Sequence, residues 1–274
     1  MFLGEAMAEK NTYKILFIGD VCGSPGRKML EDNLAKLQWE HDIDFTVVNG
    51  ENASGGRGMN CKAYGLFKDL GVDAVTMGNH TWDNRDIFNF IDKEKNIVRP
   101  LNYAKGLPGV GYAVLPMGDL RVGVVSLICR TYMNNVVADC PFAAVEEILP
   151  VLREQTGIIL VDVHGEATSE KIALGRFLDG KVSAVIGTHT HVQTNDAAVL
   201  PKGTAYLTDA GMTGPKESIL GMEIETIIQK FRTGKPYKFQ VADGDLQLNG
   251  AVITVNAAGK AEDIELINIE QSSF

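Results

Sequence analysis

The chain has 274 residues, a formal net charge of −9 and 45% hydrophobic residues. This length and apolar content suit one large α/β domain with a substantial core, and they argue against a disordered or fibrous protein. The negative charge leaves no basic surface for a nucleic-acid backbone, so we expect no sequence-specific nucleic-acid partner.

The four cysteines form no Cys-x-x-Cys pair, which fits neither a disulfide framework nor a zinc-thiolate site. An uncharged apolar run of about 18 residues, as a membrane span requires, is also missing from the sequence. We therefore expect a cytoplasmic protein with no membrane partner. Residues 1–12 are expected to be an N-terminal extension.

Short apolar runs alternate with amphipathic segments in the first hundred residues, an alternation typical of strands joined by crossover helices in a largely parallel sheet. Strands are predicted at 14–19, 44–50 and 73–79, and helices at 24–40, 62–71 and 86–94. Ser24, followed by Pro25, is expected to cap the first of these helices.

The remainder is richer in strands. Two strands across a turn are predicted within 111–128, and further strands at 157–166, 182–191, 204–211, 237–256 and 261–270. Helices are predicted at 141–154, 168–180 and 222–232. With no internal repeat or linker composition, we expect a single domain over 13–270, with cap or auxiliary elements within about 129–150 and 212–240.

Polar residues that bind metals follow five of the predicted strands. They are Asp20, Glu51, Asn52, Asn79, His80, His164, His189 and His191. Four of the five histidines belong to this set, and His41 does not. Because the carboxyl ends of parallel strands share one edge of a sheet, these side chains are expected to converge.

The types of residue indicate the metal. Carboxylate, amide and imidazole groups without a thiolate suit iron, manganese or zinc, and the histidines exclude an all-oxygen calcium cage. The set is larger than one ion needs. Two ions about 3.5 to 4 Å apart would use it, an arrangement that promotes in-line attack at phosphorus.

Six motifs between residues 19 and 215 carry a resemblance to a known family. They are GDVCGSPGR, NGEN, MGNHTWD, DVHGEATSEK, GTHTHVQT and LTDAGMTGP. In combination they resemble the calcineurin-like metallophosphoesterase superfamily, and in particular its YmdB-like cytoplasmic branch. The resemblance implies a four-layered α/β/β/α sandwich with a small loop-built cap region and a dinuclear metal site at the strand ends.

The resemblance also assigns roles by position. The first metal would be held by Asp20, Glu51, Asn52 and His191. The second would be held by Glu51, Asn79, His164 and His189, so that Glu51 is the bridge. His80 would be the general acid. Cys22 stands where the wider superfamily has a histidine, as in the YmdB-like branch, and whether its thiol contributes to the metal site is left open.

The implied function is that of a dinuclear-metal phosphodiesterase that hydrolyses small phosphodiesters, including 2′,3′-cyclic nucleotides, by attack of a hydroxide held between the ions. The alternative is a metal-binding regulatory scaffold or sensor with little turnover. Amidohydrolase barrels also use a His-x-His pair, but it follows their first strand, and eight β/α repeats are not visible here. A homo-oligomer is compatible with the sequence.

Several other polar residues have two interpretations. Asp83 either orients His80 or caps the next helix, and the cap is favoured. For Asp209, support of a metal histidine and capping of a loop stay equally open. Arg57 and Arg130 are candidate phosphate contacts, although a solvated surface position is slightly favoured. Glu166 and Glu170, which follow His164, are expected to begin the next helix.

Overall fold

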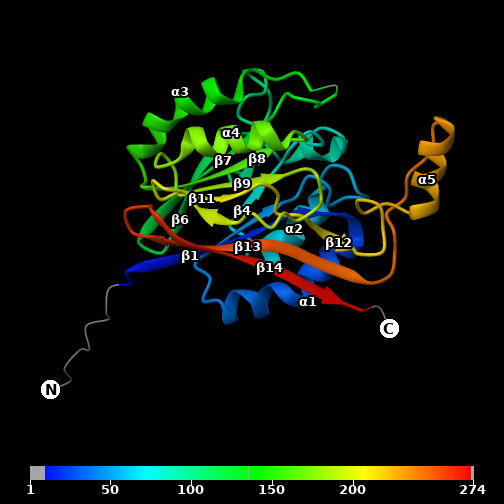
Figure 1. Ribbon diagram of the computed structural model, residues 1–274, viewed down its shortest axis with the longest axis horizontal. Helices are drawn as coiled ribbons and strands as arrows, with labels where there is room; N and C mark the ends of the chain where they lie inside the picture. The colour runs from blue at the N-terminus through cyan, green and yellow to red at the C-terminus, as the bar shows by residue number, and fades with distance from the viewer. Residues whose placement is uncertain (1–9, 135, 273–274) are drawn as a thin grey trace.

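The computed structural model describes residues 10–134 and 136–272, in which two β-sheets lie face to face between helices (Figure 1). The predicted N-terminal extension lies mostly outside the described residues. The first sheet has the strand order β2-β12-β13-β1-β3-β4-β5, with β14 paired to β13. The second sheet has the order β10-β11-β9-β8-β7-β6.

The strands of the first sheet are β1 (Thr12–Ile18), β2 (Asp20–Val21), β3 (Phe45–Asn49), β4 (Ala74–Thr76), β5 (Ile97–Val98), β12 (Met212–Pro215), β13 (Leu246–Asn256) and β14 (Ala261–Gln271). Those of the second are β6 (Tyr112–Met117), β7 (Leu120–Ile128), β8 (Ile158–His164), β9 (Ala184–Thr188), β10 (Ala198–Val199) and β11 (Ala205–Leu207). The helices are α1 (Gly23–Glu40), α2 (Cys61–Asp69), α3 (Pro141–Arg153), α4 (Thr168–Leu178) and α5 (Ile224–Thr233), with a 3-10 helix η1 (Arg85–Asn89).

Three apolar layers hold the elements together. Between the two sheets, side chains such as Phe17, Val47 and Leu160 are fully buried. A second layer lies under α1 and α2, and a third lies under α3 and α4. The order of layers is helix, sheet, sheet, helix, which confirms the predicted four-layered sandwich.

Both sheets are mixed, but the strands predicted in the first hundred residues are parallel to one another, as expected. Strands β1, β3, β4 and β5 are parallel to one another, as are β7, β8, β9 and β11. Antiparallel neighbours extend each set, namely β13 beside β1 and β6 beside β7. The parallel core of each sheet nevertheless has its carboxyl ends at one edge, as the position of a site requires.

Three local predictions need correction. The residue before α1 is Cys22 rather than Ser24, because Gly23 turns the chain at a φ of 63° and the helix begins there. Residues 86–94 form one short 3-10 helix and then turns. The strand predicted at 237–256 begins only at Leu246, since the preceding residues belong to a segment that leaves the sheets.

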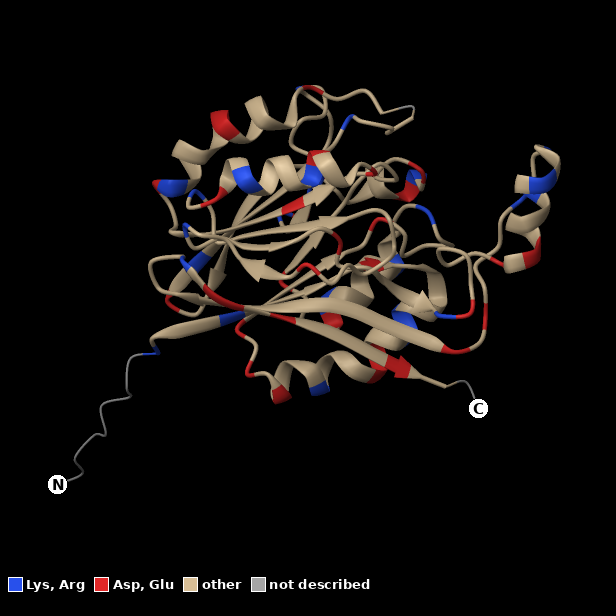
Figure 2. Ribbon diagram, viewed as in Figure 1, with Lys and Arg blue, Asp and Glu red and all other residues tan. Residues whose placement is uncertain are grey.

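That segment, residues 216–245 between β12 and β13, is called the arm. It carries α5 and stands away from the two sheets (Figure 1). Elsewhere, Lys and Arg are interspersed with Asp and Glu along the helices (Figure 2). Among the described residues, none of the helices is both long and apolar enough to cross a membrane.

The layer between the sheets provides a stability test. Replacing Leu160, which is fully buried there, by Ala is expected to lower the free energy of unfolding by about 2 to 5 kcal/mol, because methyl groups are lost and a cavity remains. Chemical denaturation measures the change. Leu107→Ala is the control, since this leucine is exposed, and it should cost no more than about 0.5 kcal/mol. Equal losses in the two variants would contradict the assigned core.

Candidate functional site

The polar residues predicted to converge do meet at the edge where the parallel strands of both sheets end. The first sheet supplies Asp20 at β2, Glu51 and Asn52 after β3, and Asn79 and His80 after β4. The second sheet supplies His164 at the end of β8, and His189 and His191 after β9. The site is therefore built across the two sheets, and it needs both to be correctly aligned.

One group of potential ligand atoms surrounds Nε2 of His164. This atom lies 2.8 Å from Oδ1 of Asn79, 3.1 Å from Nδ1 of His189 and 3.1 Å from Oε1 of Glu51. The ligand atoms of Glu51, His164 and His189 all lie within 4.8 Å of one another. This group contains the four residues that the resemblance assigned to the second metal.

A second group lies beside it. Oδ1 of Asp20 lies 3.6 Å from Nε2 of His191. The amide nitrogen of Asn52 lies 3.2 Å from the same Asp20 oxygen and 3.1 Å from the same His191 nitrogen. Half a turn of the amide presents the Asn52 oxygen, its ligand atom, at the same place. Oε1 of Glu51 lies 3.4 Å from this amide nitrogen, so Glu51 contacts both groups.

Hydrogen bonds determine which nitrogen of His164 faces the site. The hydroxyl of Thr188 donates to Oδ1 of Asp162 over 2.6 Å and therefore accepts from Nδ1 of His164 over 2.9 Å. With a proton on Nδ1, the ring directs Nε2 toward the other ligand atoms, and this nitrogen would offer its lone pair to a cation that displaces its proton. Such a partner for the distal ring nitrogen is usual for metal-bound histidines.

Asp162 also connects the two sheets. Its Oδ2 accepts hydrogen bonds from the amide of Asn49, at 3.1 Å, and from the hydroxyl of Thr76, both in the first sheet. Burial raises the pKa of this carboxyl to about 6, although the charge of His164 and the hydrogen bonds from Thr188 and Thr76 act against it. Asp162 thus lies behind the site and aligns its two halves.

Electrostatics in the site favour added positive charge. Burial alone would raise the pKa of Asp20, but the hydrogen bond and charge of His191 hold it well below its usual range. Burial likewise opposes the charge of His164, yet Glu51 raises the pKa of that ring to about 9. Burial also opposes the charge of Glu51, but the charge and hydrogen bond of His164 lower its pKa to about 2. Asp20 and Glu51 therefore remain ionised, and oxygen and imidazole donors surround them. This donor set fits hard or borderline divalent cations.

The backbone of the His-x-His segment is unusual. His189 and His191 have φ values of 99° and 63°, which non-glycine residues rarely adopt. Between them, Thr190 donates from its backbone nitrogen (3.1 Å) and its hydroxyl (2.8 Å) to Asp209. Lys171 contacts the same carboxylate at 2.7 Å and the Thr188 carbonyl at 2.8 Å.

Of the two interpretations of Asp209, loop capping is confirmed, since it accepts from the backbone nitrogens of Thr190 and Gly211. It thereby holds the segment that carries His189 and His191. Lys171, its buried partner, was missed by the sequence analysis, as were Asp162 and Thr188. The sequence does mark Asp162 as unusual, because it is a carboxylate in the middle of the apolar strand IILVDVH.

His80 lies at the rim of the cluster. Its backbone nitrogen donates to Oε2 of Glu51 over 3.0 Å, and its Nδ1 lies 2.8 Å from Oδ2 of Asp83. The preference for Asp83 as a helix cap is wrong, since Asn84 caps η1 by accepting from the Asp86 nitrogen. The chain turns one residue later than expected, so the Asp83 carboxylate faces the imidazole, and Nη1 of Arg57 lies 3.9 Å from the same oxygen.

The remaining candidate residues of the sequence analysis do not all lie at the site. Arg57 lines the same cavity as His80, whereas Arg130 is exposed and does not line it, and its backbone nitrogen is bonded to Glu170. Glu166 does not begin α4 but precedes it and lies 3.3 Å from Nε2 of His189. Glu170 does lie in the first turn of α4, as predicted.

Cys22 is buried beside Asp20, and His41 lies at the end of α1. Burial and the charge of Asp20 raise the pKa of the Cys22 thiol to about 12, which disfavours the thiolate that metals bind. His41 contacts Glu265, 3.8 Å away, and takes no part in the cluster. These positions agree with a site made of oxygen and imidazole groups.

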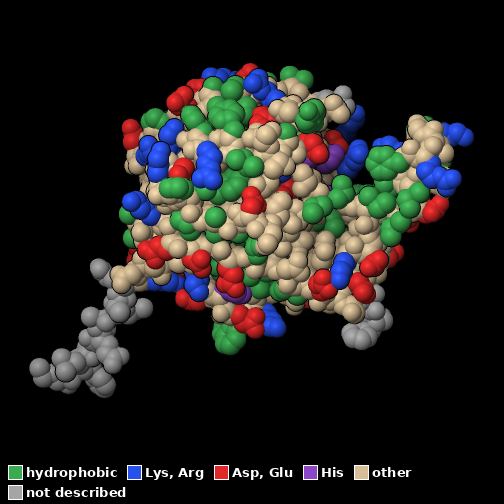
Figure 3. Space-filling model, viewed as in Figure 1, with side chains coloured by type: hydrophobic (Ala, Val, Ile, Leu, Met, Phe, Trp, Pro, Cys, Tyr) green, Lys and Arg blue, Asp and Glu red, His purple; other side chains and the backbone are tan. Residues whose placement is uncertain are grey.

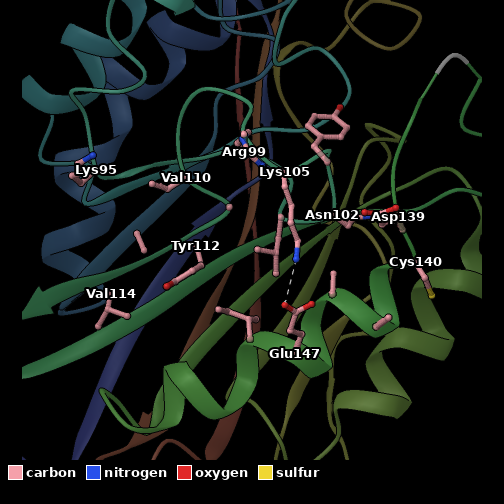
Figure 4. A pocket seen from close by; sticks show the side chains of 18 of the residues that line it. Lys95, Arg99, Asn102, Lys105, Val110, Tyr112, Val114, Asp139, Cys140 and Glu147 are labelled. Carbon is pink, nitrogen blue, oxygen red and sulfur yellow. Dashed lines mark hydrogen bonds and ion pairs between the residues drawn. The ribbon is translucent and has the colours of Figure 1, made fainter.

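Two cavities differ in their relation to the cluster. One of about 330 Å³ opens onto Glu51, Asn52, His80, His189 and His191. A larger one, of about 810 Å³, lies between the β5–β6 region and α3 (Figure 4). There the Arg99 guanidinium donates hydrogen bonds to three backbone carbonyls, and the Lys105 ammonium lies 3.7 Å from the Glu147 carboxylate. The smaller cavity is therefore the one that adjoins the cluster of potential metal ligands.

The two-sheet fold with this cluster at its strand ends is that of the metallophosphoesterases. A family model described as "YmdB-like protein" matches residues 16–267. A 2′,3′-cyclic-nucleotide 2′-phosphodiesterase of Bacillus subtilis is 49% identical over 264 residues, which cover 95% of this chain and 99% of that relative. The chain belongs to the YmdB-like protein family.

Solved structures are similar over almost the whole chain. A hypothetical protein from Thermus thermophilus has 41% identity and a TM-score of 0.88, with 94% of this chain and 99% of that chain covered. A phosphatase from Mycoplasma pneumoniae has 35% identity and a TM-score of 0.90, with 96% and 95% covered. The fold predicted from the motifs is therefore confirmed.

Gly78 provides a test of the cluster geometry. A Cβ at this position would lie 2.4 Å from ring atoms of His164, so Gly78→Ala must displace the imidazole. We expect binding of Mn²⁺, measured by calorimetry, to weaken by about tenfold to hundredfold, as when the support of a metal ligand is lost. The matched control is Gly65→Ala in α2, where an added Cβ meets nothing within 4 Å. Wild-type Mn²⁺ affinity in Gly78→Ala would contradict the assignment of His164.

Proposed function

We propose that this protein is a metal-dependent phosphodiesterase that hydrolyses small phosphodiesters, 2′,3′-cyclic nucleotides among them. The observation that carries the proposal is the convergence of buried carboxylate, amide and imidazole atoms from both sheets, with His80 at their rim. The name of the Bacillus subtilis relative supports the same class of substrate.

The first ion would be held by Asp20, Glu51, Asn52 and His191, and the second by Glu51, Asn79, His164 and His189. We propose iron or manganese, with zinc as the alternative, because no thiolate takes part. When bound, such ions supply positive charge for the phosphoryl oxygens and a water molecule of lowered pKa as the nucleophile.

The protein's own contribution to bond cleavage is assigned to His80. In hydrolysis, the oxygen of water forms a new bond to phosphorus while the bond from phosphorus to a ribose oxygen breaks. The leaving oxygen then needs a proton. Because Asp83 lies 2.8 Å from Nδ1 of His80, Nε2 is the ring atom left to donate it. Arg57, on the wall of the same cavity, is the proposed contact for a phosphate oxygen.

Other parts of the proposal concern the cell. The four cysteines are all free in the structure, which supports a reducing, cytoplasmic location. The arm and the segment before α3 are the auxiliary elements of a single domain over 13–270. A small phosphodiester is the proposed partner, rather than a sequence-specific nucleic acid or a membrane.

The role of His80 is tested by comparing leaving groups. His80→Ala should lower kcat for 2′,3′-cyclic AMP by about a hundredfold or more, because an alkoxide needs a proton to leave. Hydrolysis of bis-p-nitrophenyl phosphate should fall much less, since nitrophenolate leaves without one. His41→Ala, which changes the histidine outside the cluster, should have wild-type rates.

Metal content is measured in each variant, so that a lost ion is not mistaken for a lost acid. Equal losses on both substrates in a fully metallated His80→Ala protein would overturn the acid assignment. Absence of turnover of every diester by wild-type protein loaded with iron or manganese would instead support a metal-binding scaffold or sensor.

A further inference from the structure

The cavity beside the cluster has a second wall of different chemistry. Its first wall is the polar cluster with His80 and Arg57. Its second wall is formed by the arm, through Ile219, Leu220, Met222, Ile227, Lys230, Phe231 and Phe239. Among these lining residues of the arm, Lys230 is the charged one. The cavity therefore joins a polar end, where the proposed ions would bind a phosphate, to an apolar end.

The apolar side of the arm is directed toward the body of the protein. Figure 3 shows hydrophobic side chains on the inner side of the arm and charged side chains on its outer side. Phe231 is 81% exposed, and Leu220, Ile224 and Ile228 are also exposed. A group of exposed apolar side chains beside a site is unusual in a soluble domain and marks a binding surface.

Aromatic and cationic groups are combined on this wall. The ammonium of Lys230 lies 4.6 Å from the ring centroid of Phe239, and Phe231 follows Lys230 directly in α5. A nucleobase is a planar group that stacks on aromatic rings and cations, and a phosphodiester attached to it would reach the opposite wall. The cavity volume of about 330 Å³ is at the lower end for small-molecule sites, which favours a mononucleotide over a longer strand.

We propose that the arm is the nucleobase-binding wall of the site, with the base stacked on Phe231 while the phosphodiester lies at the metal cluster. This inference rests on the proposed function and deepens it, since it states which part of the substrate is recognised and where. Stacking is tolerant of base identity, and the rotatable N–H donors of Lys230 can reach an acceptor atom on any of the four bases. The four 2′,3′-cyclic nucleotides should consequently have kcat/KM values within about tenfold of one another.

The test compares 2′,3′-cyclic AMP with methyl riboside 2′,3′-cyclic phosphate, which has the same cyclic diester and no base. In wild-type protein the ratio of their kcat/KM values reports recognition of the base. Phe231→Ala should lower that ratio tenfold or more, chiefly through KM for cyclic AMP. Trp39→Ala is the matched control, because Trp39 is also 81% exposed but lies in α1, on the outer side of the first sheet, and should leave the ratio as in wild type.

A second measurement does not depend on turnover. Saturation-transfer NMR should detect contact between metal-free wild-type protein and the base protons of adenosine, and Phe231→Ala should abolish it. If wild-type protein hydrolyses no diester, the proposed function fails, and this binding signal alone decides the inference. Loss of the signal in Phe231→Ala supports the base wall, whereas an equal signal in both proteins overturns it.

An unchanged ratio of kcat/KM values in Phe231→Ala would also overturn the inference. Sedimentation velocity then identifies the alternative occupant of the apolar face. If Phe231→Ala converts an oligomer into monomers while the ratio stays constant, the arm binds a second copy of this chain and not a base.

Discussion

The arrangement of the site depends on one buried carboxylate, Asp162, which touches neither the cavity nor any ligand atom. It accepts hydrogen bonds from Asn49 and Thr76 of one sheet and from Thr188 of the other. The contacts from the first sheet align the strands that carry Glu51 and Asn79 with the strand that ends in His164. The contact with Thr188 places a His164 proton on Nδ1 and so turns Nε2 toward the site.

The second constraint is the strained segment that carries the other two histidines. Positive φ values at His189 and His191 cost of the order of 1 to 3 kcal/mol each, and they persist only where the surroundings enforce them. Asp209 supplies that enforcement through Thr190, and the buried ammonium of Lys171 neutralises it. Because of this backbone conformation, His189 faces the His164 group and His191 faces the Asp20 group, although only one residue separates the two histidines.

Much of this organisation could be predicted from the sequence because strand ends, glycines and histidines are local signals. The alternation of apolar runs located most strands, and the polar residues after them identified the convergent cluster. What sequence could not supply were contacts between distant elements. Asp83 had a plausible local role as a cap, and only the turn at Asn84 assigns it to His80. Likewise, the first sheet is mixed because β13 pairs antiparallel with β1, and these strands are more than 200 residues apart.

The central claim is a two-ion centre bridged by Glu51, whose Oε1 lies 3.1 Å from the His164 ring and 3.4 Å from the Asn52 amide. Its most direct test is the number of metal ions per chain, measured by elemental analysis after anaerobic loading, in wild-type protein and in Glu51→Gln. Glutamine keeps the size of the side chain but removes the charge that two cations share. The account predicts two ions per wild-type chain and at most one in the variant. Two ions retained in Glu51→Gln, or a single ion in wild-type protein, would contradict it.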